Sequence, residues 1–448
     1  MPPIDHGDTL AGERTRKGEH ALLIQPFAGG PLQEGVLEEF TDLARSAGAS
    51  IATTITARIE RPSPSTLIGS GKVEEVKAAA DATGADLVLV NHTLSPVQER
   101  NLERALERRV IDRTGLILDI FAQRAHSHEG KLQVELAQLR HLATRLVRGW
   151  THLERQRGGS IGLRGPGETQ LETDRRLLQK RVEQLQKRLD KVEVQRTQMR
   201  RARVRSELPR VALVGYTNAG KSTLFNVLAG AEAYAADQLF ATLDPTVRRV
   251  PIPGGQVVLA DTVGFVRDLP HELVAAFRST LSEAREADLL LHVVDASDPQ
   301  HDERIAQVDE VLQVVGAGDL PQLLVFNKID RIEGAEPRHD AQDGSPEHAP
   351  RERVWISARD GRGLDLLERA LGHRLGVQRV SGELRLPPTA GRLRARLHAL
   401  DVVQAEHADD QGGWQLRVDM PLAEANRLAA DAGGELLQPL LPPPEPDY

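Results

Sequence analysis

A phosphate-binding loop is indicated by one run of eight residues, in which two glycines are followed at fixed spacing by Lys and Ser. The run is Gly215, Tyr216, Thr217, Asn218, Ala219, Gly220, Lys221 and Ser222. An apolar stretch, 211–214, precedes it, and a helix-like stretch that begins at Thr223 follows it. The glycines let backbone N–H groups and a helix N-terminus point at phosphates, while Lys221 supplies a positive charge and the Ser222 hydroxyl binds Mg²⁺. Residues 215–223 are therefore predicted to bind the phosphates of a nucleotide.

Four shorter motifs follow along the chain. They are Thr242, Asp261-Thr262-Val263-Gly264, Asn327-Lys328-Ile329-Asp330 and Ser357-Ala358. Asp261 ends an apolar, strand-like run, and open α/β sheets place their ligands at the carboxyl ends of strands. Its carboxylate can hold Mg²⁺ through water, and the Gly264 N–H can reach a γ-phosphate.

The last two motifs select the base. The Asp330 carboxylate can accept hydrogen bonds from N1–H and the 2-amino group of guanine, which adenine does not offer, so GTP is predicted over ATP. Asn327 would brace the loop and the base, and the aliphatic stem of Lys328 would cover the purine face. A backbone N–H of Ser357-Ala358 would reach guanine O6. The predicted ligands are thus GTP and GDP.

Composition excludes several classes of function. The chain has 448 residues, 40% of them hydrophobic and 27% charged, which is ordinary for a globular protein of three or four domains. It has no cysteine, so disulfides, thiolate metal sites and cysteine nucleophiles are excluded. We expect no membrane span, because no apolar run approaches about 18 residues. The location is predicted to be cytoplasmic, with peripheral contact to a membrane left open. The net charge of −8 requires that any RNA contact come from a local basic patch.

The N-terminal part, 1–128, is predicted to be a small α/β domain with a parallel sheet. Apolar runs at 21–24, 49–52, 87–90 and 110–111 alternate with helix-period stretches at 37–46, 73–82 and 95–106. Within it, Gly69-Ser70-Gly71-Lys72 resembles a second phosphate loop. Thr66 stands where the first glycine is needed and Val73 where Ser or Thr is needed, so we interpret it as a turn into a helix.

Residues 129–206 are predicted to form an antiparallel helical hairpin. Apolar residues alternate spacings of four and three in two stretches, from Leu132 to Leu153 and from Leu178 to Val192, as in coiled-coil seams. Between them, the glycines and proline of 157–167 cannot continue a helix.

The hairpin tip is predicted to contact RNA. It carries arginines and glycines with almost no carboxylates, which lets the backbone approach a phosphate chain closely. The predicted contacts are Arg157, Gly158, Gly159, Arg164 and Gly165. The alternative, a solvated charged face, stays open, above all for the arginines on the helices.

A P-loop GTPase domain is predicted over 207–375, and a linker, a small α+β domain and a Pro-rich tail over 376–448. Within the GTPase domain, 331–350 lacks apolar periodicity and is predicted to be a disordered insertion.

Longer motifs give a resemblance to one family. They are 69–75, 94–102, Val110-Ile111-Asp112-Arg113-Thr114, 165–172 and 237–244. On these residues the chain resembles the HflX family of ribosome-associated GTPases over nearly its whole length. The resemblance implies GTP hydrolysis, binding to the large ribosomal subunit and its RNA with the hairpin tip near the peptidyl-transferase centre, and splitting of stalled or idle ribosomes under heat stress. We expect a monomer.

Three positions bear on the mechanism. Phe265 stands where Ras-like GTPases carry the glutamine that orients the attacking water, so intrinsic hydrolysis is predicted to be slow. Thr242 matches the switch threonine whose hydroxyl binds Mg²⁺ in the GTP state. Asn218 resembles the asparagine that helps related GTPases hold K⁺, although it could equally well only stabilise the loop. The residues predicted to act in hydrolysis are Lys221, Thr242, Gly264 and Asn218, with Ser222 and Thr242 as metal ligands.

Two other function classes remain open beside the ribosome factor. One is an RNA-binding switch in which GTP only gates binding, and the other is a signalling GTPase with a protein target. Stimulation of hydrolysis by ribosomes distinguishes the first class from these two.

Overall fold

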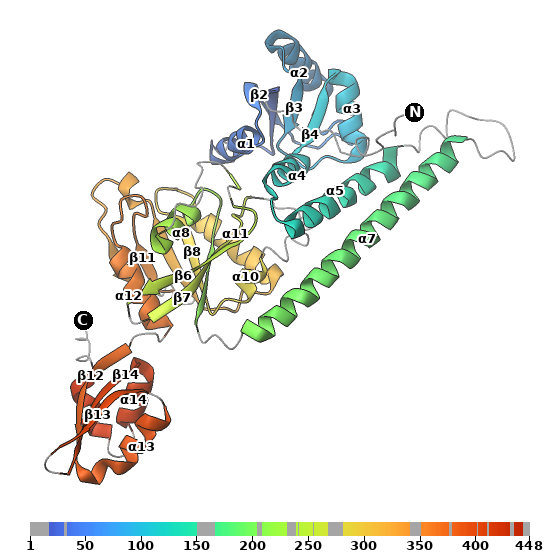
Figure 1. Cartoon of the computed structure of the whole chain (residues 1–448). Coiled ribbons are helices and arrows are strands. Elements are labelled where there is room, and N and C mark those ends of the chain that lie inside the picture. Colours follow the sequence, from blue (N-terminus) through green and yellow to red (C-terminus); the bar gives the residue numbers. More distant parts are fainter. Residues whose placement is uncertain are drawn as a thin grey trace.

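The computed structural model of the chain describes residues 18–30, 34–149, 166–203, 208–230, 239–240, 242–253, 255–267, 281–340, 351–375, 379–400, 402–409, 412–430 and 434–441. Within them lie a four-stranded, a seven-stranded and a three-stranded sheet. Figure 1 shows the sheets in three separate bodies, with two long helices beside the first two. This mixed α/β architecture confirms the predicted fold class. Among the described residues, no helix combines the length and the apolar character needed to cross a bilayer.

The first body is a parallel α/β unit. Its elements are β1 (His20–Phe27), α1 (Glu34–Ser46), β2 (Ser50–Arg58), α2 (Ser70–Thr83), β3 (Leu87–Val90), α3 (Pro96–Leu106), β4 (Arg109–Asp112) and α4 (Arg113–Arg124). The strand order is β2-β1-β3-β4, and every pairing is parallel. All residues of β3 are buried, because helices cover both faces of the sheet. Gly69 precedes the first residue of α2, so the interpretation of this glycine pair as a turn into a helix is confirmed.

Two long helices form the hairpin, α5 (His128–Gly149) and α7 (Pro166–Arg203). They lie side by side and run in opposite directions (Figure 1). Leucines of both predicted seams are buried in one cluster, including Leu132 and Leu136 from α5 and Leu178 and Leu185 from α7. The tip residues predicted to contact RNA, Arg157, Gly158, Gly159, Arg164 and Gly165, lie outside the described residues.

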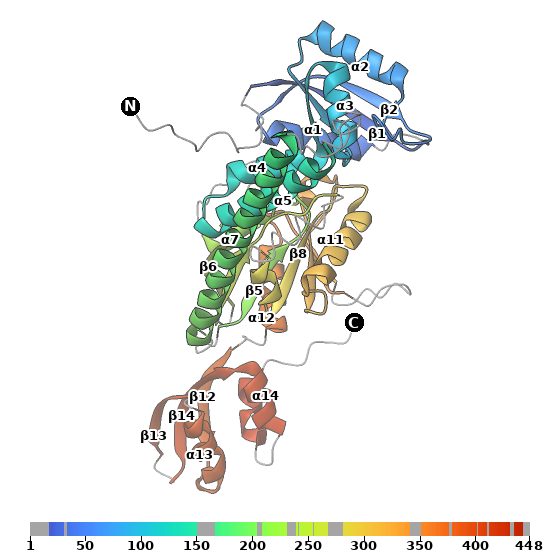
Figure 2. The same ribbon diagram turned by 90° about the vertical axis from the view of Figure 1, so that its right-hand side faces the viewer.

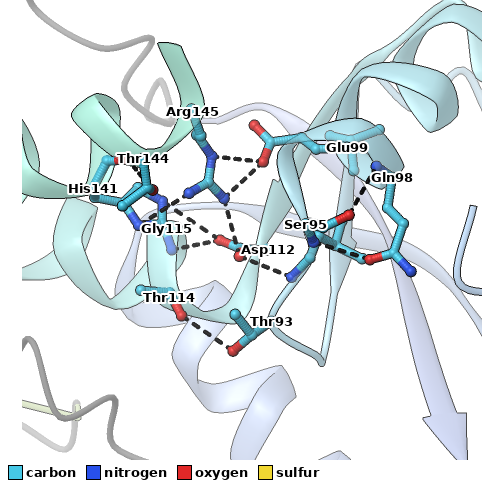
Figure 3. A network of polar contacts seen from close by, with 12 residues as sticks. Thr93, Ser95, Gln98, Glu99, Asp112, Thr114, Gly115, His141, Thr144 and Arg145 are labelled. Carbon is cyan, nitrogen blue, oxygen red and sulfur yellow. Dashed lines mark hydrogen bonds and ion pairs between the residues drawn. The ribbon is translucent and has the colours of Figure 1, made fainter. Parts of the chain in front are cut away.

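A polar network fastens α5 to the first body (Figure 3). Asp112, at the carboxyl end of β4, accepts hydrogen bonds from the backbone N–H groups of Gly115 at 2.8 Å and Leu94 at 3.1 Å. Arg145 of α5 pairs with Asp112 at 3.1 Å and with Glu99 of α3 at 2.6 Å. The α5 helix is therefore bound to the carboxyl end of β4, an edge strand of the first sheet.

The second body is a seven-stranded sheet with helices on both faces. Its elements are β5 (Arg210–Val214), α8 (Lys221–Ala229), β6 (Thr246–Ile252), β7 (Gly255–Asp261), α10 (Ser282–Arg285), β8 (Leu289–Asp295), α11 (His301–Val315), β9 (Gln322–Asn327), η1 (Ile329–Arg331), β10 (Arg338–Asp340), β11 (Arg353–Trp355) and α12 (Leu364–Arg374). The order is β10-β11-β9-β8-β5-β7-β6, with only the edge strands β6 and β10 antiparallel to their neighbours. Helices α8 and α12 share a core with one face of this sheet, and α10 and α11 with the other.

The predicted disorder of 331–350 is wrong for part of that segment. Arg338–Asp340 forms β10, which pairs antiparallel with β11. Three residues carry too little periodicity to be recognised from sequence, and they become a strand because an edge strand of the sheet is available to pair with them. Residues 341–350 lie outside the described part of the chain.

One hydrophobic core joins the first two bodies. It contains Leu23, Phe40 and Phe121 of the first body together with Phe240 and Phe265 of the second. Phe121 and Phe240 meet edge to face, with ring centroids 4.5 Å apart. The two bodies therefore pack on each other through buried aromatic and aliphatic side chains.

The third body is a small α+β unit, as predicted. Its elements are β12 (Arg379–Leu386), η2 (Pro388–Ala390), α13 (Gly391–Ala399), β13 (Val403–Ala408), β14 (Trp414–Pro421), α14 (Leu422–Ala430) and η3 (Gly434–Leu440). The sheet is antiparallel in the order β12-β14-β13. This unit lies at the far end of the second body from the first (Figures 1 and 2).

Candidate nucleotide-binding site

The loop between β5 and α8 has room only for glycines at its two ends. Gly215 has φ +141°, and a Cβ there would come within 2.2 Å of the Val293 carbonyl oxygen. Gly220 has φ +93°, and its Cβ would come within 2.3 Å of Asn327 Nδ2. Both residues combine a left-handed backbone with close contact, which explains why the motif needs glycine at these positions. The predicted strand, loop and helix are all present.

Lys221 is held across the loop from the first turn of α8. Its ammonium donates hydrogen bonds to the carbonyl oxygens of Gly215 at 3.0 Å and Tyr216 at 2.8 Å. Burial lowers the pKa of Lys221 to about 8. A buried cation whose hydrogen bonds go to carbonyl oxygens is favourably placed to bind an anion, because an anion would offset the cost of burial.

Three oxygen-bearing side chains meet beside Lys221. The Ser222 and Thr242 hydroxyls both donate to Asp261 Oδ2 at 2.8 Å, and they lie 2.9 Å from each other. Burial raises the pKa of Asp261, although the two hydroxyls oppose the shift. The buried Oδ1 of Asp261 receives no hydrogen bond from any described side chain. Hard oxygen donors gathered in this way fit a Mg²⁺ ion.

The stretch from Asp261 to Gly264 lies directly against the phosphate loop. A Cβ on Gly264 would come within 2.7 Å of Thr217 Cγ2 and 2.9 Å of Lys221 Nζ, so glycine permits this approach. Thr262 donates its hydroxyl to the Leu213 carbonyl oxygen at 2.6 Å, and Val263 is buried. This brings the Gly264 backbone next to Lys221.

Phe265 is a core residue. Its side chain is 2% exposed and belongs to the core shared with the first body. Its backbone bonds to the phosphate loop, since its N–H donates to Gly215 O at 3.1 Å and its carbonyl accepts from Thr217 N at 2.7 Å. The position after Gly264 thus serves packing and offers no group to orient water.

The other end of the site is a closed set of hydrogen bonds around Asn327. Its Nδ2 donates to the Ala219 carbonyl oxygen at 2.9 Å, and its Oδ1 accepts from the Ala358 N–H at 2.9 Å. The Ser357 hydroxyl donates to Asp330 Oδ1 at 2.7 Å. Asn327 therefore links the phosphate loop to the Ser357-Ala358 loop, and Asp330 is held in place. One backbone N–H of Ser357-Ala358 was predicted to reach guanine O6; here the Ser357 N–H donates to Arg362 O and the Ala358 N–H to Asn327.

Asp295 is a further member of this end that the sequence did not reveal. It lies at the carboxyl end of β8, and its Oδ2 accepts from Lys328 Nζ at 2.8 Å. Burial opposes ionisation, but the hydrogen bonds from Lys328 and Ser297 together lower the pKa of Asp295. Lys328, at φ +68°, is thereby held at its ammonium by Asp295. In the sequence, the only sign of a role for Asp295 was its position at the end of a strand.

The phosphate end is tied to the first body, which sequence analysis also missed. The Tyr216 hydroxyl donates to Glu39 of α1, and Glu39 forms an ion pair with Arg113 of α4. Arg113 also donates to the carbonyl oxygen of Arg267 at 2.7 Å, three residues beyond Gly264. The guanidinium of Arg304 lies 4.4 Å from the centre of the Tyr216 ring. Both the phosphate loop and the segment after Gly264 therefore contact one buried ion pair.

A cavity of about 550 Å³ opens along this junction. It is bounded by α1, by the outer side of the phosphate loop and by the β8–α11 connection. Asn218, the exposed residue of the loop, lines it with φ +60°.

The second body has the features that define a P-loop GTPase. They are the sheet covered on both faces, the glycine loop, the oxygens of Ser222, Thr242 and Asp261, and the linkage through Asn327. Three protein families match the sequence: GTP-binding GTPase N-terminal over 34–122, GTP-binding GTPase Middle Region over 124–203, and 50S ribosome-binding GTPase over 210–328. GTPase HflX of Escherichia coli (strain K12) is 56% identical over 417 residues, which cover 93% of this chain and 97% of that protein. The chain belongs to the HflX family and is a GTP hydrolase.

Two other proteins resemble the chain over most of its length. GTPase HflX of Magnetococcus marinus is 47% identical over 400 residues, 88% of this chain and 90% of that one. The second is a GTP-binding protein from the hyperthermophilic archaeon Sulfolobus solfataricus, with a crystal structure in complex with GDP. Its sequence is 25% identical to this chain, and the TM-score is 0.44. It covers 80% of this chain and 98% of its own.

Proposed function

We propose that this GTPase acts on the large ribosomal subunit and that its nucleotide cycle separates the subunits of stalled or idle ribosomes under stress such as heat. The carrying observation is the match of 210–328 to the 50S ribosome-binding GTPase family in a chain whose GTPase domain is joined to a long helical hairpin. A factor of this kind needs a nucleotide site that changes state and an extended element that reaches RNA.

The phosphate end of the site binds and positions the GTP phosphates. Lys221 neutralises the β- and γ-phosphates, and backbone N–H groups of the loop and of the first turn of α8 point at them. The Gly264 N–H bonds to the γ-phosphate. Loss of the γ-phosphate after hydrolysis therefore releases the segment that follows Gly264.

Ser222 and Thr242 would hold Mg²⁺ with their hydroxyls in this proposal, and Asp261 would hold it through water. The ion would neutralise charge that develops on the phosphate oxygens during hydrolysis. Thr242 reaches the ion only while the γ-phosphate holds its segment in place, which makes this threonine the sensor of the GTP state.

The base end selects guanine. Asp330 accepts from the N1–H and 2-amino groups, the Lys328 stem covers the purine, and Asn327 braces both neighbouring loops. An unpaired buried carboxylate is costly, so adenine nucleotides are disfavoured.

Slow intrinsic hydrolysis follows from Phe265, which brings no polar group to the attacking water. Binding to the large subunit supplies the orientation of the attacking water that Phe265 cannot provide. Hydrolysis then proceeds with Lys221, Thr242, Gly264 and Asn218 as the acting residues. The Asn218 side chain is exposed beside the loop, where it can help to hold a K⁺ ion.

The hairpin tip makes the contact to ribosomal RNA, through Arg157, Gly158, Gly159, Arg164 and Gly165, and the protein acts as a monomer. Arginine–phosphate contacts release counterions, so binding weakens steeply as salt rises.

The test compares the full chain with a variant in which 158–167 is replaced by a minimal turn. GTP hydrolysis is measured with and without purified large subunits, and subunit affinity is measured over a range of salt. We expect strong stimulation of the full chain, and weaker binding with a flatter salt dependence for the variant, at unchanged intrinsic hydrolysis. Equal stimulation and splitting by the variant would refute the role of the tip. Nucleotide-dependent binding to naked ribosomal RNA without stimulated hydrolysis would favour an RNA-binding switch instead.

A further inference from the structure

The residues just before α5 are bound by a carboxylate from the GTPase domain. Oδ2 of Asp244 accepts hydrogen bonds from the backbone N–H groups of His126 at 2.8 Å and Ser127 at 2.7 Å. Oδ1 accepts from the Ser127 hydroxyl, which itself accepts from the Gly130 N–H at 2.9 Å. Helix N-termini leave several N–H groups without partners inside the helix, and the Ser127 hydroxyl satisfies one of them, that of Gly130. Asp244, from a distant part of the chain, holds this capping serine in place.

The helix is adapted to this carboxylate. A Cβ on Gly130 would come within 2.4 Å of Asp244 Oδ1 and 2.9 Å of Ser127 Oγ. Glycine is unfavourable inside a helix, so its presence in the first turns of α5 is explained by the close approach of Asp244.

Asp244 belongs to a short segment, 242–244, whose other end is a predicted metal ligand. Thr242, two residues before Asp244, donates its hydroxyl to Asp261 at 2.8 Å. Leu243 between them is 2% exposed in the core shared with α4. Residues 242–244 are therefore held at both ends, at the metal-binding oxygens and at the base of the hairpin.

The flanking contacts leave this segment little freedom to move independently. The Leu239 N–H donates to the Ser46 hydroxyl of α1 at 3.0 Å, and Phe240 packs on Phe121 of α4. Phe240 has φ +56°, a left-handed conformation that is costly for an aromatic residue. Strained conformations of this kind are typical of segments that exist in two arrangements.

We propose that Asp244 is a positioning residue through which the hairpin and Thr242 control each other. In the GTP state Thr242 is fixed at the metal, and Asp244 fixes the first turn of α5. Loss of the γ-phosphate releases Thr242 and loosens the cap, which changes the angle of the hairpin. Because coupling between two sites is reciprocal, a hairpin held by a bound partner stabilises the Thr242 position needed for hydrolysis. The inference rests on the role of Thr242 in the proposed function.

The distance between hairpin and GTPase domain tests the coupling without any ribosome. The chain has no cysteine, so spin labels attach only where cysteines are introduced. Leu177→Cys on α7 and Val314→Cys on α11 suit this purpose, because their side chains are 57% and 50% exposed. We expect distance distributions that differ between GDP and a non-hydrolysable GTP analogue, and Asp244→Ala should remove the difference.

Two further variants make the result specific. Gly130→Ala displaces the carboxylate while Asp244 remains, and should also remove the difference. Asp302→Asn removes a carboxylate that is 91% exposed on α11, and should leave the difference intact. Circular dichroism on each variant checks that the hairpin is still helical. A nucleotide-dependent difference that persists in Asp244→Ala, or one that is absent from the unsubstituted background, overturns the coupling.

A kinetic readout separates this inference from the proposed function. With large subunits present, Asp244→Ala should lower the stimulated kcat about fivefold, the size of a lost helix cap, at nearly constant KM for GTP. A rise in KM at constant kcat would contradict the positioning role. If subunits do not stimulate even the unsubstituted protein, the proposed function fails, whereas the distance measurement still decides the coupling.

Discussion

The two ends of the nucleotide site are held in different ways. At the base end, Asn327 bonds to the phosphate loop and to Ala358, and Ser357 bonds to Asp330, all within the GTPase domain. At the phosphate end, Tyr216 bonds to Glu39 of the N-terminal body, and the segment with Thr242 holds the start of the hairpin through Asp244 and Ser127. We infer from this difference that, in the proposed function, the base end recognises the nucleotide in every state, whereas the phosphate end responds to other parts of the molecule.

This contrast has a thermodynamic meaning. Contacts that are the same in every state of the protein contribute to affinity but not to coupling, whereas contacts that differ between states transmit it. Changes at the base end should therefore alter which nucleotide binds. Changes at the phosphate end should alter the effect of nucleotide binding on hydrolysis and on the hairpin.

The largest expected effect is at the base end. Asp330→Asn should weaken GTP binding by about 100-fold, because the amide donates where the carboxylate accepted. Xanthosine triphosphate should bind better to the variant, and should still shift the hairpin distance as GTP does in the parent. Calorimetric titration with both nucleotides measures this, with Asp360→Asn as the control for a neighbouring, more exposed carboxylate. Unchanged GTP affinity in Asp330→Asn would remove Asp330 from the base site.

An intermediate effect is expected where the phosphate loop meets the N-terminal body. Tyr216→Phe removes only the hydroxyl that bonds to the buried Glu39, and hydrogen bonds to buried charged groups are among the stronger ones. We expect kcat to fall about fivefold while the preference for GTP over xanthosine triphosphate is unchanged. Steady-state kinetics with both nucleotides test this. A loss of base selectivity with kcat unaltered would reverse the comparison between the two ends.

The smallest expected effect concerns Asn218, which contacts neither neighbouring body through any hydrogen bond among the described residues. Replacing Na⁺ by K⁺ should raise hydrolysis severalfold if the amide helps to hold the ion. Asn218→Gly keeps the left-handed backbone and loses the amide, whereas Asn218→Ala loses both. Hydrolysis rates in the two salts therefore separate the roles: K⁺ sensitivity that survives in Asn218→Gly would leave the residue with a backbone role only.

Local motifs explain how much of this site could be predicted from sequence. The phosphate loop, Asp261 and Asn327 each stand at the end of an apolar run, so strand, ligand position and residue type are all contained in a few consecutive residues. The parallel sheet and the leucine seams of the hairpin were likewise visible as periodic patterns.

The connections between bodies could not be predicted in this way. Tyr216 and Glu39 are 177 positions apart, and Asp244 and Ser127 are 117 apart. A buried Glu or a capping Asp looks in sequence like any surface carboxylate, because its partner is supplied only by the fold. The β10 strand was missed for a related reason, since its pairing with β11 decides its conformation.

The length of α7 gives the small movements of the nucleotide site a mechanical advantage. Its 38 residues form one uninterrupted helix, about 57 Å long at 1.5 Å per residue. If such a rigid rod pivots by about 5° near the GTPase domain, its other end at Pro166 sweeps roughly 5 Å, which follows from that length alone. That sweep exceeds the ~3.4 Å step between neighbouring bases of a nucleic-acid strand. Shifts at Thr242 that are too small to repack the surrounding core can thus displace the far end of the hairpin by more than the spacing between stacked bases.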